Sequence, residues 1–283
     1  MMTSRFGSAV PERILVGVDS SAPSKAALVW ALERAVLRGV TEITAMHVID
    51  DPKHFPGSAR GDRATEREER VLAQRTHAVA SLAPDVSIRP VVVRGTVCET
   101  MAEASAAFDV VVVGTHASDT VTKQKEHSLG LRLARRCLST TVIVPERRAS
   151  RGRQIVVGVD LPGASVPAFD FAAAEAEKTH SDLSLLTVHA NTTDGDTRAE
   201  STREQVDALE LAASRVRADH PHLSITRSIV SGSAPAAFAR SSYGARMIVL
   251  GAPDADPIGA STFDQIVRSS AVPVAVAGTK PPQ

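Results

Sequence analysis

The chain holds 283 residues, 43% of them hydrophobic, and its 32 basic and 32 acidic residues give a formal net charge of zero. This length favours two domains, and halves of this size bury a core without disulfides. The two cysteines, Cys98 and Cys137, lie in helical patterns of the first half, where we expect buried core or groove residues, and they indicate reduced thiols in a cytosolic protein. Residues 1–12 lack the apolar stretch of a signal peptide and no apolar run is long enough to cross a bilayer, so we expect a cytoplasmic protein with no membrane partner.

Charge is divided unevenly along the chain. Residues 1–153 hold 22 basic and 17 acidic side chains, and residues 154–283 hold 10 and 15, so the two parts carry +5 and −5. The densest basic stretch, residues 123–153, contains no aromatic residue on which bases could stack. We interpret it as a solvated helix face followed by a charged linker, and we expect no nucleic-acid partner.

The chain repeats itself in order. An apolar strand ending in Val-Gly-Val-Asp opens each half, at residues 13–19 and 153–160. Later landmarks recur in the same sequence: residues 45–48 and 185–188, residues 93–96 and 230–233, and apolar runs ending at Gly114 and Gly251. Because a solenoid repeats every 20 to 50 residues or so, this long repeat predicts two copies of one globular domain. A charged segment after Pro145 marks the boundary, giving domains of residues 1–147 and 148–283.

The predicted strands are continuous apolar runs. They comprise residues 14–18, 91–93, 110–113 and 141–144 in the first half, and residues 155–159, 247–250 and 272–277 in the second. Continuous runs predict strands covered on both faces, as in a parallel sheet, and helically spaced apolar residues lie between them, at residues 28–36 and 169–176. Each half therefore reads β-α-β-α-β-α-β-α-β. This order predicts an α/β protein with two tandem, doubly wound, parallel five-stranded sheets and helices on both faces.

Ligands of doubly wound folds bind beyond the carboxyl ends of the strands. In the first half those ends carry Asp19, the residue after Val48, and Gly114. The corresponding positions in the second half are Asp160, the residue after Val188, and Gly251. Each sheet is thus expected to present one candidate pocket.

Taken together, the Val-Gly-Val-Asp strands, the Ala-rich helices, Met46-His47-Val48, Val-Val-Val-Gly and the closing Val-Ile-Val-Pro resemble the universal stress protein family, over nearly the whole chain twice. The resemblance implies an adenine nucleotide alpha hydrolase-like fold and a non-catalytic stress-response protein.

ATP-binding members of this family hold phosphate with a motif of Gly, two residues, Gly, nine residues, Gly, then Ser or Thr. Here this spacing falls on Gly114, Ala117, His127 and Ser128. Because two of the three glycines are replaced, two lost backbone contacts would weaken binding ~100-fold, unless His127, Lys123 or Lys125 donates to phosphate instead.

By the same resemblance, Asp19 contacts the adenosine part, the Val48 backbone reads adenine, Gly114 approaches phosphate and Ser128 bonds to it. The alternative interpretation is structural, with Asp19 and Asp160 capping the next helix or turn and Ser128 starting a helix. The equivalents in the second half are Asp160, Val188, Gly251 and Ser261. There Asp254 and Asp256 would repel phosphate and Pro253 and Pro257 supply no N–H, so we expect no ATP at the second site.

Three functions remain open. The leading one is a tandem universal stress protein with a degenerate nucleotide motif in both halves; the others are a sensor that binds ATP or another adenine nucleotide in the first domain only, and a weak nucleotide hydrolase. No P-loop, G-x-G-x-x-G or nucleophile-elbow motif is present in the sequence, so we expect no catalytic residues. His116, Asp119, Glu126 and His127 lack the spacing of a metal site, so we expect none.

Partners follow from the same resemblance. Family dimers pair at their closing strands, so we expect the two halves to associate within the chain through residues 141–144 and 272–276. An unpaired strand edge would also be an aggregation hazard, which favours the same pairing within the chain. A homodimer of two chains is expected in addition. The sequence does not identify a client protein.

Overall fold

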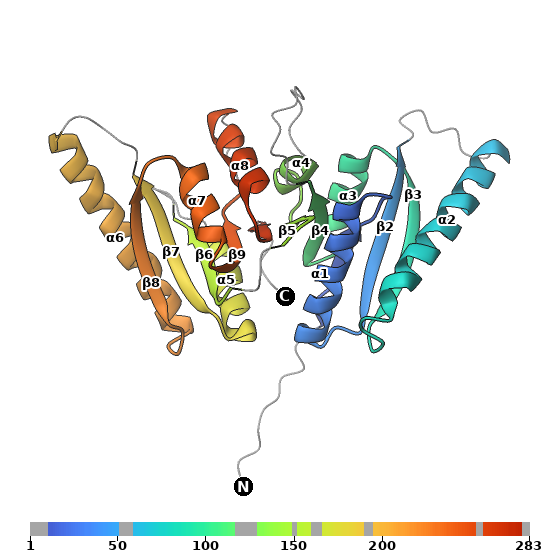
Figure 1. The fold of residues 1–283 in the computed structure, drawn as a ribbon, viewed down its shortest axis with the longest axis horizontal. Helices are drawn as coiled ribbons and strands as arrows, with labels where there is room; N and C mark the ends of the chain where they lie inside the picture. Colours follow the sequence, from blue (N-terminus) through green and yellow to red (C-terminus); the bar gives the residue numbers. More distant parts are fainter. Residues whose placement is uncertain are drawn as a thin grey trace, which may run out of the picture.

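A computed structural model describes residues 11–50, 59–116, 129–148, 152–159, 166–189, 195–252 and 257–278. Strands and helices alternate through both halves, in the predicted order (Figure 1). The first half comprises β1 (Ile14–Gly17), α1 (Ala22–Arg38), β2 (Glu42–Asp50), α2 (Ala59–Ala80), β3 (Ser87–Gly95), α3 (Val97–Ser105), β4 (Val110–Thr115), α4 (Leu129–Ala134) and β5 (Thr140–Pro145). The second comprises β6 (Gln154–Gly158), α5 (Val166–Thr179), β7 (Asp182–His189), α6 (Gly195–Asp219), β8 (Ile225–Ser231), α7 (Ala234–Ser242), β9 (Ala245–Leu250), α8 (Pro257–Ser269) and β10 (Val274–Val276).

The strands form one sheet of ten, in the order β3-β2-β1-β4-β5-β10-β9-β6-β7-β8. All pairs within each half are parallel, and the closing strands β5 and β10 pair antiparallel, with Val274 opposite Ile143 and Val276 opposite Thr141. The predicted α/β class and the two sets of five parallel strands are confirmed, but the two sets are not separate sheets. They join edge to edge because β5 and β10 would otherwise each leave a row of backbone N–H and C=O groups without partners.

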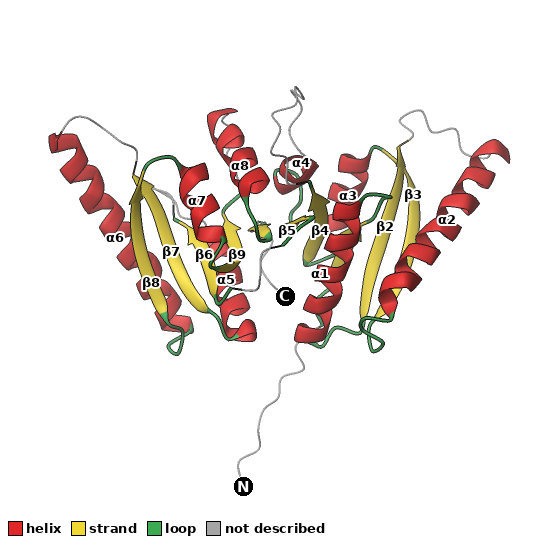
Figure 2. Cartoon of the chain, in the orientation of Figure 1, coloured by secondary structure: helices red, strands yellow, loops and turns green. Residues whose placement is uncertain are grey.

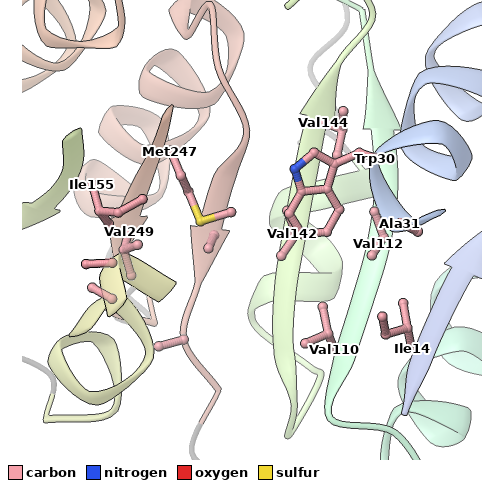
Figure 3. Close-up of a cluster of buried hydrophobic side chains, with 14 of the residues drawn as sticks. Ile14, Trp30, Ala31, Val110, Val112, Val142, Val144, Ile155, Met247 and Val249 are labelled. Atoms are coloured by element: carbon pink, nitrogen blue, oxygen red, sulfur yellow. The ribbon is translucent and has the colours of Figure 1, made fainter. Parts of the chain in front are cut away.

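Helices cover both faces of the sheet, so the protein has three layers (Figure 2). One hydrophobic cluster packs α1, α2, α5 and α6 against alternate strand residues such as Ile14 and Val16, and a second packs α3, α4, α7 and α8 against the opposite face through residues such as Leu15. Each cluster includes residues of both halves. Figure 3 shows part of the first, with Val142 and Trp30 of one half and Ile155 and Met247 of the other.

Three local expectations were wrong. Residues 91–93 are only half-buried, because β3 is an outermost strand and the sheet ends there. Val36, predicted on the buried face of its helix, is 59% exposed. Cys137 is buried as expected, but it lies after the end of α4 rather than within a helix.

Candidate functional site

The candidate site of the first half lies where the chain changes direction across the sheet. From β1 the chain continues to β2 and β3 on one side, whereas β4 and β5 lie on the other side. Such a switch point leaves a crevice beyond the carboxyl ends of the two central strands, here β1 and β4. Asp19 follows β1 and Gly114 lies near the end of β4, so the fold brings these two predicted residues to one edge. In the second half, β6 and β9 occupy the equivalent place.

Asp19 organises the turn between β1 and α1. Its Oδ1 accepts hydrogen bonds from the backbone N–H of Ser21 at 2.8 Å and from the Ser21 hydroxyl at 2.6 Å. Ser21 is the N-cap of α1, and its hydroxyl accepts from the N–H of Ser24 at 3.3 Å. The Asp19 carboxylate is exposed to solvent. The geometry thus gives Asp19 the turn-stabilising role of the structural alternative, while its carboxylate stays accessible from the crevice.

Gly114 has a structural reason to be glycine. A Cβ at this position would lie 2.2 Å from the backbone carbon and oxygen of Pro23, in the first turn of α1. Only glycine allows the start of α1 to approach β4 this closely. The contact places the N-terminal turn of α1 against β4, at the crevice. The positive end of the helix dipole favours anions and α1 has no acidic residue in its first turn, but Pro23 supplies no N–H there and the Ser24 N–H already donates to Ser21.

The Val48 backbone is directed toward the same crevice. In a parallel strand, successive residues direct their backbone groups to opposite neighbours. The Met46 carbonyl accepts from the N–H of Val18 at 2.8 Å, so Val48, two residues further on, also faces the β1 side. Because β1 ends at Gly17, Val48 points beyond the last residue of that strand. The Val48 side chain itself is buried in the core, so the backbone is the part available to a ligand.

The second half differs at the corresponding point. The N–H of Val159 bonds to the Leu186 carbonyl at 2.8 Å, so Val188 faces beyond β6 as Val48 faces beyond β1. Here, however, the side-chain amide of Gln205 donates to the Val188 carbonyl at 3.4 Å, and Gln205 is buried. The second half therefore occupies this acceptor with its own side chain.

The first half places a carboxylate where the second has Gln205. Matching Leu72 of α2 to Leu209 of α6, both buried, makes Glu68 the equivalent of Gln205. Glu68 faces His47 instead, with 3.6 Å between its Oε2 and the His47 Nε2. The His47 Nδ1 lies 2.8 Å from the Val18 carbonyl, to which it donates. Sequence reasoning missed both Glu68 and Gln205; comparing the two repeats position by position would have found them.

The structure locates some of the predicted site residues. Asp19, Val48, Gly114, Val188, Gly251 and Ser261 are described, whereas Ala117, His127, Ser128 and Asp160 lie outside the described residues. Gly251 directly follows β9, at the carboxyl edge as predicted from its place after an apolar run. Ser261 lies within α8, exposed, and its hydroxyl accepts from the Gln265 side chain at 3.3 Å.

Of the four residues considered as metal ligands, His116 alone falls in a described range. Its Nδ1 lies 3.3 Å from the Glu146 carboxylate, and both side chains are exposed beside the junction of β4 and β5. Within the described ranges, no three His, Cys, Asp or Glu side chains converge as metal ligands do. None of the helices in those ranges is long and apolar enough to cross a membrane.

A tandem α/β fold, with one topological switch point per half at the carboxyl ends of parallel strands, defines the class of protein. The model of the universal stress protein family matches the chain twice, at residues 11–145 and 152–278. The chain therefore belongs to the universal stress protein family, as a tandem member. The two matches together span most of the chain, one in each half.

Solved structures agree with this fold. A universal stress protein from Archaeoglobus fulgidus is similar with a TM-score of 0.67 at 20% identity, over 95% of this chain and 96% of that one. A protein of unknown function from Pseudomonas aeruginosa gives a TM-score of 0.52 at 17% identity, over 94% and 92% of the two chains. No curated protein sequence matches the chain significantly. At these identities the likeness shows the fold alone.

Proposed function

We propose that the protein acts by binding rather than catalysis, as a cytoplasmic stress-response protein in which neither half holds ATP by the family's glycine motif. The single observation that carries this proposal is the hydrogen bond from Gln205 to the Val188 carbonyl, which fills the second half's backbone acceptor from within the chain. In the first half, Ala117 and His127 replace two glycines of the phosphate motif. The second half thus engages one backbone acceptor with its own side chain, and the first half has two non-glycine residues in the phosphate motif.

A second candidate is a sensor that binds an adenine nucleotide in the first half only. It is favoured by the direction of the Val48 backbone, beyond the end of β1, and by the exposed carboxylate of Asp19 beside it. A ribose hydroxyl could donate to that carboxylate, and the start of α1 would favour the phosphates. The two candidates share one site and differ in affinity.

Isothermal titration of the full chain with ATP and Mg²⁺ separates them. No heat at millimolar nucleotide is expected for the leading proposal, and micromolar binding at one site per chain would establish the sensor instead. The matched variants Asp19→Ala and Asp160→Ala change equivalent positions in the two halves. A sensor would lose binding with Asp19→Ala and keep it with Asp160→Ala.

Two further measurements test the remaining parts of the proposal. Mass spectrometry of the small molecules released on denaturation would contradict it if one equivalent of adenine nucleotide appeared per chain. Phosphate release from ATP should equal the rate without protein. Turnover that disappears in Asp19→Ala would instead indicate the weak hydrolase.

The proposed cytoplasmic location and dimer require their own tests. Cys98 and Cys137 are both free and buried, which suits a reducing compartment. Cell fractionation should recover the protein with cytoplasmic markers. Light scattering after gel filtration should give twice the mass of 29.8 kDa for a homodimer, and the monomer mass would refute that part of the proposal.

A further inference from the structure

The helices α1 and α5 are equivalent elements of the two repeats. An offset of 141 residues aligns Gly17 with Gly158 at the ends of β1 and β6. The same offset aligns the helix ends, where Gly39 and His180 both have positive φ, of 67° and 48°. The hydrogen bonds that follow are equivalent too: N–H of residue 40 to the carbonyl of 35, and N–H of residue 181 to the carbonyl of 176, both at 2.9 Å. The same offset therefore relates every position of α5 to its equivalent in α1.

Two residues at equivalent positions of the two repeats contact each other where the halves join. Arg34 and Glu175 are 141 residues apart, and the Arg34 Nη1 lies 2.5 Å from the Glu175 Oε2. Both side chains are buried, at 3% and 7% exposure. Trp30 and Phe171 are related by the same offset, and their rings lie 5.5 and 5.4 Å from the Arg34 guanidinium. Because β5 and β10 pair antiparallel, the two similar halves are related by an approximate twofold rotation, or pseudo-twofold axis. A residue that contacts its own equivalent lies beside that axis, so the axis passes between α1 and α5.

The charged side chains around the axis pair with partners of opposite sign. The Glu175 carboxylate also accepts from the Arg38 Nη2 at 2.7 Å, and the Glu12 carboxylate accepts from the Arg34 Nε and Nη2, both at 2.9 Å. Burial would lower the pKa of Arg34, but the charges of Glu175 and Glu12 outweigh burial and raise it. Burial would raise the pKa of Glu175, but Arg34 and Arg38 lower it. Both groups therefore remain charged at neutral pH.

This pairing of opposite charges would be lost if two copies of the same half associated symmetrically. If two first halves met in the same geometry, position 34 would face position 34, and two buried guanidinium groups would lie together. Two second halves would place two buried carboxylates there. Each Arg34 would keep its own Glu12 but would face a like charge in place of Glu175, and each Glu175 would lose both Arg34 and Arg38. Two like charges buried against each other are unfavourable, because the water that each has lost is replaced by repulsion at that contact.

We propose that Arg34 and Glu175 form a recognition pair at the pseudo-twofold axis. This pair favours the association of a first half with a second half over the association of two identical halves. The partner that this surface fits is thus the other repeat. The opposite formal charges of the two parts of the chain, +5 and −5, act in the same direction at longer range. Any homodimer of the whole chain must then form through another surface.

Full-length variants can reproduce the two rejected junctions within one chain. Glu175→Arg gives the Arg–Arg junction and Arg34→Glu gives the Glu–Glu junction. The neutral double variant Arg34→Met with Glu175→Met removes both charges, and a buried pair replaced in this way is often tolerated. We expect each like-charge variant to melt about 10 °C below the wild type, and the neutral variant to melt within a few degrees of it.

The control is Asp170→Arg. In the wild type, the Asp170 Oδ1 lies 3.8 Å from the Arg215 Nη2, and both side chains are more than 40% exposed. The melting temperature of this variant should change little, because water screens exposed like charges. If Glu175→Arg does not fold, Arg34→Met in the same chain should restore folding. The proposal is wrong if that second change restores nothing, or if the like-charge variants melt with the neutral one.

Discussion

Gly114 shows how one residue can serve the fold at a position that its family motif assigns to phosphate. The first turn of α1 lies directly against it, through the backbone of Pro23. The glycine therefore has a packing role whether or not a nucleotide binds. Its presence in the motif is weak evidence for a ligand.

Gly114→Ala should destabilise the protein by about 1–3 kcal/mol, because the added methyl group would lie 2.2 Å from the Pro23 carbonyl and force α1 away from β4. Urea unfolding followed by circular dichroism measures this change. Gly244→Ala is the matched control, since a Cβ there meets no atom within 4 Å. Equal unfolding free energies for the two variants would contradict the close packing seen at Gly114.

His180 occupies a left-handed backbone conformation that its equivalent in the first half, Gly39, adopts without strain. His180→Gly should therefore stabilise the protein, by about 0.5–1 kcal/mol after the greater chain entropy of glycine is subtracted. Gly39→Ala should destabilise it by a similar amount, since a Cβ there has open space and suffers from its φ of 67° alone. Thermal unfolding of both variants tests the pair. A stabilised Gly39→Ala would refute the strain argument.

The packing of α1 on α5 makes stability depend on pH. The pKa of Glu175 in the folded protein is lowered by Arg34 and Arg38. A lowered folded pKa means that the carboxylate contributes stability above its unfolded pKa, and that this contribution is lost as the pH falls through the folded value. The loss thus belongs to the acid range, below the ordinary carboxyl pKa of about 4.3.

We expect the wild type to lose more unfolding free energy than Glu175→Gln when the pH is lowered from about 6 to 3, since the variant has no carboxylate to protonate. Urea titrations at several pH values measure the difference. Glu103→Gln, a change of the same kind at an exposed residue of α3, should keep the wild-type pH dependence. Parallel curves for Glu175→Gln and the wild type would show that Glu175 does not link stability to pH.

Joining the halves changes which strands are edges. In the ten-stranded sheet β5 and β10 lie at the centre, and β3 and β8 are outermost. Hydrogen exchange of the whole chain should therefore find the amides of β5 and β10 among the slowest, and those of β3 and β8 faster. Mass spectrometry of peptic fragments provides the comparison within one experiment. Exchange in β5 and β10 as fast as in β3 would mean that the halves do not pair stably in solution.

Much of the fold was predictable because its signals are local. Continuous apolar runs located strands such as β4 and β9, helical spacing located α1 and α5, and the repeated Val-Gly-Val-Asp located the two halves. The candidate site was predictable only in part. Asp19 and Gly114 were found because strand ends are visible in the sequence, whereas Gln205 reaches Val188 from a helix whose rotation depends on packing.

By itself, the sequence determined the α/β class, the duplication and the strand ends at which Asp19 and Gly114 lie, because periodicity and strand order depend on near neighbours in the chain. Association through the closing strands was an expectation from the family resemblance, but only the tertiary structure decided that they pair antiparallel into one continuous sheet, and that Arg34 meets Glu175 across 141 residues. Those contacts depend on how whole halves are placed, and the free energy that places them comes from closing two exposed strand edges and burying the two hydrophobic clusters that the halves share.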